Sequence, residues 1–133
     1  MIVEAQRMQN GVAILGLEGE LDTASLDLFK SQVKVLVSEG FSKIIVDCRE
    51  LGVISSSGLA ALLWARSTAT SASGAVYLTH VSALVSRVLH ITKLSTLLKI
   101  EPTTRGLLER LGSIRKTPSQ RRKSLASSVN FRA

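Results

Sequence analysis

Short apolar runs typical of β-strands alternate along this chain with segments whose apolar residues recur at helical spacing. The first two runs, residues 2–7 and 12–17, are joined by Gln9-Asn10-Gly11, and residues 18–22 follow as a predicted loop. Because Asn-Gly supplies the positive φ angles of a tight turn, these two runs predict an antiparallel hairpin. A β-branched run at residues 43–47 then predicts a buried central strand.

Helical segments lie between and after these strands. The clearest of them has apolar residues at positions i, i+3, i+4, i+7 and i+8, which are Val81, Leu84, Val85, Val88 and Leu89. Further helices are predicted over residues 26–37, 55–70 and 104–111, and further strands over residues 75–79 and 97–100. Strands that alternate with helices after an opening hairpin predict an α/β fold, in which about four helices cover a mixed sheet containing βαβ units.

The 133 residues suffice for one domain, and their net charge of +7 is unevenly distributed. Residues 1–104 contain nine basic and nine acidic side chains, whereas residues 105–133 contain eight basic side chains and only Glu109. We therefore expect no direct nucleic acid binding by the folded body. Residues 1–112 are predicted to form the domain, and residues 113–133 a basic tail that is too polar to fold and is expected to be disordered.

The sequence favours a cytoplasmic protein. No apolar run has the length of a membrane span, and the N-terminus lacks the features of a signal peptide. Cys48 is the only cysteine, so no internal disulfide is possible and a reducing compartment is expected.

Motifs of catalysis and of cofactor binding are missing from the sequence. It contains no P-loop, no dinucleotide fingerprint and no nucleophile elbow. Cys48, His80 and His90 are too scattered to form a metal cluster. We expect Cys48 to be a buried, inert thiol and both histidines to lie on the surface or beside a helix. The chain is therefore predicted not to be an enzyme and to need neither cofactor nor metal, and a nucleotide-binding or hydrolytic function is disfavoured.

Several short segments share the order and spacing of one known family. They are Gly19-Glu20-Leu21-Asp22, Ile44-Ile45-Val46-Asp47, Ser56-Ser57-Gly58-Leu59, Val85-Ser86-Arg87-Val88-Leu89 and the closing stretch from Ile91 to Ile100. Together they resemble the STAS-domain family over residues 2–111, and specifically its anti-sigma factor antagonists. The third segment is similar to the family's D-S-[ST]-G-[LI] segment from the serine onward. The resemblance implies a STAS-like fold.

The resemblance also implies a switch. Such antagonists, when unphosphorylated, bind a serine kinase anti-sigma factor and so release the sigma factor that this kinase holds inactive. The kinase phosphorylates the serine two places before the glycine, which is Ser56 in this chain, with Ser57 and Ser55 as the alternatives. A phosphatase resets the phosphorylated form. The implied role is signal transduction and transcription regulation in a bacterium, by protein–protein interaction.

The chain departs from the family at the position before this serine, where Ser55 replaces an aspartate. Serine is a preferred helix N-cap, so residues 55–57 have the alternative role of simply starting a helix. Together with the basic tail, this departure motivates a second function, a non-switching STAS scaffold subunit of a signalling assembly or of a lipid-transport complex.

Other residues near the serine run are candidates for partner binding. Asp22 is predicted either to form part of an acidic docking surface or to cap the helix that follows it. Ser55 and Ser57 would flank the phosphoacceptor, and Gly58, which has no side chain, would let a partner's backbone approach. For Trp64 a core position is favoured over a partner-facing anchor.

The basic tail contains Arg121-Arg122-Lys123-Ser124. Its charge alone would attract an anionic lipid surface or nucleic acid, and its pattern resembles a site for a basic-directed kinase. We favour the simpler interpretation of a solvated, flexible end.

Overall fold

The predicted opening hairpin is present in the computed structural model, which describes residues 1–114. Strand β1 (Ile2–Arg7) runs antiparallel to β2 (Val12–Leu21). Asn10 and Gly11 have φ angles of 62° and 69°, the left-handed values that a two-residue hairpin turn needs. The local Asn-Gly signal was therefore sufficient to predict this turn.

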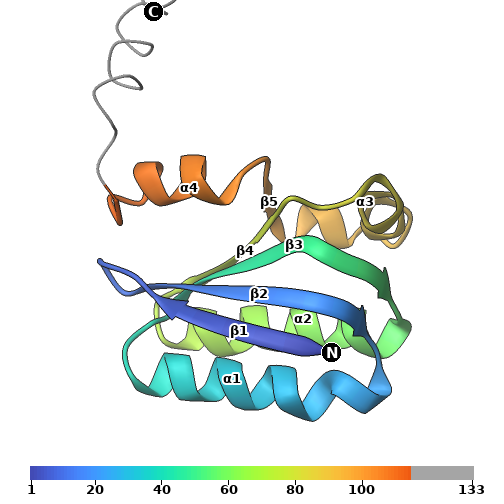
Figure 1. Ribbon diagram of the computed structural model, residues 1–133, viewed down its shortest axis with the longest axis horizontal. Coiled ribbons are helices and arrows are strands. Elements are labelled where there is room, and N and C mark those ends of the chain that lie inside the picture. The colour runs from blue at the N-terminus through green and yellow to red at the C-terminus, as the bar shows by residue number, and fades with distance from the viewer. Residues whose placement is uncertain (115–133) are drawn as a thin grey trace, which may run out of the picture.

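The five strands form one mixed sheet in the order β1-β2-β3-β4-β5 (Figure 1). The other three strands are β3 (Lys43–Ile54), β4 (Ala75–Thr79) and β5 (Lys99–Glu101). Strands β2 to β5 are parallel to one another, and a helical connection joins each to the next. The predicted α/β fold is confirmed.

Four helices pack on this sheet: α1 (Leu26–Ser38), α2 (Ser56–Ser71), α3 (Ala83–Ile91) and α4 (Thr104–Arg110). Short 3-10 turns precede α1 (Thr23–Ser25) and β5 (Leu94–Thr96). Helices α1 and α2 lie on one face of the sheet, and α4 lies on the other (Figure 1). No helix within residues 1–114 is long and apolar enough to cross a membrane.

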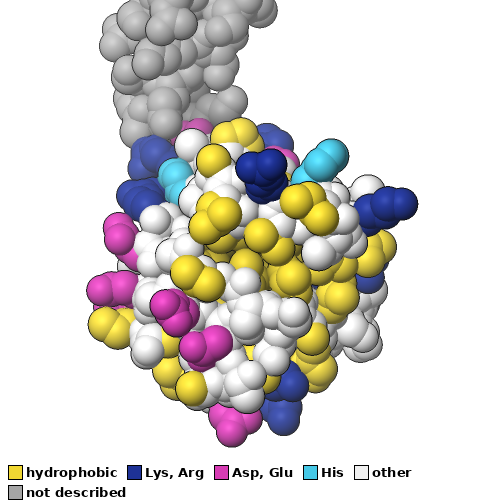
Figure 2. All heavy atoms as spheres, turned by 90° about the vertical axis from the view of Figure 1, so that its right-hand side faces the viewer, with side chains coloured by type: hydrophobic (Ala, Val, Ile, Leu, Met, Phe, Trp, Pro, Cys, Tyr) yellow, Lys and Arg dark blue, Asp and Glu magenta, His cyan; other side chains and the backbone are white. Residues whose placement is uncertain are grey.

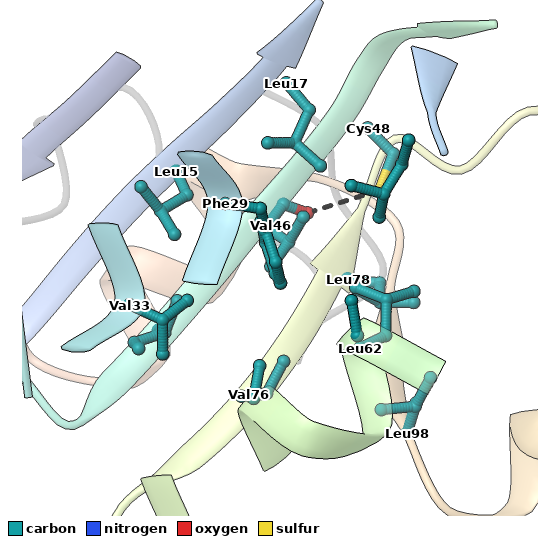
Figure 3. Packing of buried hydrophobic residues seen from close by; sticks show 14 of the residues in the cluster. Leu15, Leu17, Phe29, Val33, Val46, Cys48, Leu62, Val76, Leu78 and Leu98 are labelled. Carbon is teal, nitrogen blue, oxygen red and sulfur yellow. Dashed lines mark hydrogen bonds between the residues drawn. The ribbon is translucent and has the colours of Figure 1, made fainter. Parts of the chain in front are cut away.

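The main core lies between the sheet and helices α1, α2 and α3. Figure 3 shows Phe29 from α1 against Val46, and Leu62 from α2 against Leu78. A smaller cluster on the other face joins α4 to the sheet through Leu107, Leu108, Val12, Ile14 and Ile45. Strands β2 and β3 are thus buried on both faces only where α4 covers them.

Two strands are longer than the sequence indicates. The predicted loop at residues 18–22 is wrong for residues 18–21, because β2 continues to Leu21, and β3 extends from the predicted residues 43–47 to Ile54. The two polar extensions pair with each other across irregular register, with Glu18 opposite Glu50 and Leu21 opposite Ile54. Pairing between segments distant in the sequence stabilises these extensions, and no local pattern reports it.

The packed body reaches Ile114. Ser113 is buried, and its hydroxyl donates a hydrogen bond to the Gln9 carbonyl at 2.7 Å. The Asn10 side-chain amide donates to the carbonyls of Leu111 and Gly112 at 3.2 Å and 3.1 Å. The rest of the predicted tail, including residues 121–124, lies outside the described residues.

Candidate functional site

Ser55 caps helix α2. Its backbone is extended (φ −88°, ψ 174°), and its hydroxyl accepts a hydrogen bond from the Gly58 amide at 3.1 Å. The same hydroxyl donates to the Leu21 carbonyl at 3.3 Å, which ties the start of the helix to the end of β2. Aspartate and serine are both strong N-cap residues. The start of α2 in this chain therefore has a side-chain cap without an aspartate at position 55.

Ser56 is the first residue of α2 and is exposed. Within residues 1–114 the Ser56 hydroxyl makes no hydrogen bond, and the capping hydroxyl of this helix is that of Ser55. The backbone N–H groups of a helix's first turn lack intrahelical partners and attract anions. The Ser56 hydroxyl therefore takes no part in capping the helix. It is exposed to solvent and lies beside backbone N–H groups that can donate to a phosphate.

Ser57 and Asp22 bind the neighbouring 3-10 turn. The Ser57 hydroxyl lies 3.1 Å from the Thr23 hydroxyl, which links α2 to the segment before α1. Asp22 Oδ1 accepts from the Ser25 amide at 3.2 Å, while Ser25 Oγ accepts from the Asp22 amide at 3.0 Å. Asp22 therefore acts as a cap, but of the 3-10 turn Thr23–Ser25 and not of α1 itself, whose N-cap is Ser25; its part in docking stays a prediction.

Gly58 is buried against this chain's own residues. A Cβ placed on it would lie 2.3 Å from the Leu21 carbonyl oxygen and 2.9 Å from Ile54 Cγ1. The glycine is therefore required by the close approach of β2 and β3 to the first turn of α2. The sequence suggested that Gly58 allows a partner's backbone to approach. In the structure, contacts within this chain are what require a glycine here.

Apolar side chains are exposed on the side of the molecule where α2 begins. Figure 2 shows hydrophobic side chains gathered on this face. Leu84 and Ile91 of α3 are 60% and 69% exposed, and Val53 at the end of β3 is 48% exposed. The amphipathic helix predicted from Leu84 and its neighbours is present, but Leu84 itself lies outside the core. Val85 and Leu89 are buried in the core and Val81 and Val88 pack against it, whereas the apolar arc is too wide for Leu84 to be covered as well.

Trp64 on α2 is partly buried at the edge of the main core. The ammonium groups of Lys30 and Lys34, both on α1, lie 5.4 Å and 5.9 Å from its ring centroid. These distances are within the range of cation–π attraction. Trp64 thus lies at the boundary between core and solvent and is covered by two lysines of α1. This position is neither the fully buried core site nor the open, partner-facing anchor that the sequence suggested.

Cys48 is buried in β3, as predicted (Figure 3). Burial, aided by the negative charge of Asp47, raises the pKa of its thiol to about 12. The thiol is therefore protonated at neutral pH and is a poor nucleophile. Within residues 1–114 no three or more His, Cys, Asp or Glu side chains come together as a metal site.

A polar network that the sequence did not reveal holds α4 on the sheet. The hydroxyls of Thr79 and Thr104 lie 2.6 Å apart, and Thr104 donates to Asp47 Oδ2 at 3.0 Å. His80 Nε2 accepts from the Thr104 amide at 3.2 Å and from the Arg49 guanidinium at 2.8 Å. His80 thus has a structural role, whereas His90 is exposed on the last turn of α3.

The capping arrangement predicts different effects for two adjacent serines. Ser55→Ala should lower the free energy of unfolding by about 1 kcal/mol, because the Gly58 amide loses its acceptor. Ser56→Ala should change it by less than about 0.5 kcal/mol. Urea denaturation of both variants beside the wild type measures the difference, and equal destabilisation would contradict this assignment of the cap.

The amino-acid sequence matches a known domain family. The STAS domain family matches residues 5–106. The chain belongs to this family. No curated protein sequence matches the chain.

Solved structures of STAS proteins have the same fold. A Thermotoga maritima protein assigned to the anti-sigma factor antagonists is 25% identical, with 82% of this chain and 93% of that chain covered and a TM-score of 0.74. The phosphorylated form of the Bacillus cell fate determinant SpoIIAA is 18% identical, with 83% and 99% covered and a TM-score of 0.67. A sulfate transporter family protein from Wolinella succinogenes is 19% identical, with 80% and 89% covered and a TM-score of 0.70. The STAS fold therefore occurs in antagonists and in transporter proteins alike.

Proposed function

We propose that this STAS domain is an anti-sigma factor antagonist that acts in the cytoplasm by binding and not by catalysis. Unmodified, it binds a serine kinase anti-sigma factor and so permits sigma-factor-dependent transcription. Phosphorylation of Ser56 by that kinase ends the interaction, and a phosphatase restores it. The observation that supports this proposal most is the exposed Ser56 hydroxyl, which begins α2 while Ser55 caps it.

A phosphate on Ser56 is expected to stabilise the free domain and to destabilise its complex with the kinase. In the free domain, about two negative charges at a helix N-terminus interact favourably with the helix dipole and the first-turn amides. In a complex, the same charges occupy a surface fitted to a neutral hydroxyl and lose their water. The modification therefore favours dissociation without unfolding the domain.

The exposed apolar residues supply binding area that does not depend on phosphorylation. Leu84 and Ile91 are seven positions apart on α3, so they share one side of this helix. They lie outside the core, and with Val53 they form apolar surface that a partner could cover. Apolar surface of this kind marks protein–protein contact sites. We propose that the kinase that phosphorylates Ser56 also binds this apolar surface.

Leu84→Asp should weaken binding of the kinase about tenfold, because a charge would be placed where apolar surface is buried in the complex. The free energy of unfolding should stay within about 1 kcal/mol of the wild type, since Leu84 is exposed. Ser86→Asp is the matched control. It adds the same charge on the same helix two positions away, and residues two apart do not share a helix face. Titration calorimetry measures both affinities, and equal affinities for the two variants would exclude this surface from the interface.

The proposal is tested directly with the serine kinase anti-sigma factor of the same cell. The two proteins are mixed without and with ATP, the complex is followed by size-exclusion chromatography, and the antagonist is followed by intact mass. We expect a complex that dissociates as one phosphate appears, and no phosphate on Ser56→Ala. If neither a complex nor a phosphate on residues 55–57 forms, the proposal is wrong.

A non-switching scaffold subunit is the second candidate function. The fold that the chain shares with a sulfate transporter family protein favours it, as does the missing aspartate at Ser55. In a scaffold, Ser56→Ala and Ser56→Asp would both leave every interaction intact. In the switch, the first would bind permanently and the second would not bind.

A further inference from the structure

One part of the sheet face that carries α4 is not covered by it. Figure 1 shows α4 over the end of the sheet nearer the β1–β2 turn. Beyond α4 lies a hollow of about 270 Å³ that is lined by side chains of β1, β2 and β3. We call it the acidic groove and define it by Glu4, Gly16, Glu18, Asp47 and Glu50. A neighbouring hollow of about 190 Å³ shares three of these residues and extends toward Gln6 and Ile14, the side on which α4 lies.

The register of the strands concentrates negative charge in the acidic groove. Glu4 lies opposite Gly16, which in turn lies opposite Asp47, so a position without a side chain separates two carboxylates. In the next row Glu18 is directly opposite Glu50. Like charges directly opposite each other on neighbouring strands are destabilising.

The cations of the described residues do not compensate for this charge. The ion pairs within residues 1–114 join Arg7 to Glu39 and Arg110 to Glu101, and neither includes a groove carboxylate. Arg49 lines the groove and donates to His80, so its single positive charge stands against the four carboxylates of Glu4, Glu18, Asp47 and Glu50. The acidic groove therefore has a surplus of carboxylates and suits a basic occupant.

The chain itself contains a basic segment of sufficient length. Residues 115–133 have no Asp or Glu and contain Arg115, Lys116, Arg121, Arg122, Lys123 and Arg132. The described chain ends beside the β1–β2 turn, where Ser113 binds the Gln9 carbonyl. From Gln9 back to Ile2 the strand spans roughly 23 Å. Seven residues of extended chain after Ile114 would also span roughly 23 Å, so a segment of this length is long enough to reach the groove.

We propose that the basic C-terminal segment, residues 115–133, binds the acidic groove of its own domain, with residues 121–123 opposite Glu18 and Glu50. The interaction is electrostatic and intramolecular, so it weakens as salt screens the charges. It explains why like charges are tolerated opposite each other on β2 and β3. It does not depend on the proposed function, because neither Ser56 nor a kinase takes part.

The test uses the full-length protein with a nitroxide spin label in the tail. Cys48 is buried and its thiol is protonated at neutral pH, so Ser127→Cys supplies the one reactive thiol of the variant. Amide signals of a ¹⁵N-labelled sample are compared with the label oxidised and reduced. We expect at least twofold stronger broadening at Glu4, Gly16, Glu18 and Glu50 than at α1, and its loss in roughly 0.5 M NaCl.

Charge-neutral variants and a mixing experiment complete the test. Glu18→Gln with Glu50→Gln should abolish the selective broadening, whereas Asp27→Asn on α1, the matched control, should preserve it. Broadening that is absent, uniform or unchanged in the double variant would overturn the proposal. So would broadening of ¹⁵N-labelled wild type by unlabelled, spin-labelled protein, because a second copy's tail would then occupy the groove. Ser56→Ala should behave as the wild type, which separates this outcome from that of the phosphorylation experiment.

Discussion

Gly58→Ala is expected to lower the free energy of unfolding by about 3 kcal/mol, the upper part of the usual range for overpacked sites. The new Cβ would lie 2.3 Å from the Leu21 carbonyl oxygen, and a backbone atom cannot turn away as a flexible side chain does. The end of β2 or the first turn of α2 must therefore shift. That shift also disturbs the hydrogen bonds of Ser55 to the Gly58 amide and to the Leu21 carbonyl, so the helix cap is weakened as well.

Gly52→Ala is the matched control for this substitution. Gly52 lies on the extension of β3 that leads into α2, but a Cβ on it would be 3.8 Å from its nearest neighbour, the Gly19 carbonyl oxygen. The free energy of unfolding should change by less than about 1 kcal/mol, because the added methyl meets only ordinary contacts. Chemical denaturation of both variants provides the comparison. Equal free energies of unfolding for the two variants would show that the first turn of α2 can shift at little cost and that Gly58 is not structurally required.

Ser56→Asp should weaken binding of the serine kinase anti-sigma factor about a hundredfold. A carboxylate buried at an interface fitted to a hydroxyl loses about 3 kcal/mol, and each 1.4 kcal/mol corresponds to about tenfold in affinity. The free energy of unfolding should change by less than about 0.5 kcal/mol, since an acidic side chain in the first turn of a helix is compatible with its dipole. Calorimetric titration with the kinase and urea denaturation measure the two quantities separately.

Ser67→Asp controls for charge alone. Ser67 is exposed on the same helix, roughly 16 Å farther along its axis, so it adds one negative charge away from the proposed interface. We expect it to bind within about twofold of the wild type. If both variants bind as tightly as the wild type, Ser56 is no switch and the scaffold function is favoured instead.

Features encoded by neighbouring residues could be predicted from the sequence. The Asn10-Gly11 turn, the start of α2 in the serine run and the burial of Cys48 all depend on local signals, and each is present in the structure. The serine run also predicted the start of a helix, whereas Ser56 as the phosphoacceptor follows from the family resemblance and stays a prediction. The structure adds how the three hydroxyls differ: Ser55 caps, Ser57 contacts Thr23, and Ser56 is exposed.

Features that depend on tertiary contact could not be predicted in this way. The extension of β2 through residues 18–21 needs a partner strand some 30 positions away in the sequence. The exposure of Leu84 depends on how much sheet remains for α3 to cover, which helical periodicity does not report. The hydrogen bond between Thr104 and Asp47 joins residues 57 positions apart. Sequence periodicity describes a single element, whereas these features arise between elements.

Hydrogen bonds from Ser113 to Gln9, and from Asn10 to Leu111 and Gly112, join residues more than a hundred positions apart. This separation has a consequence for synthesis of the protein. The β1–β2 turn is synthesised about a hundred residues before the segment that covers it. Domains fold as units as the chain emerges. The apolar face of β2 that Leu107 and Leu108 bury is therefore exposed on the nascent chain until α4 has been synthesised.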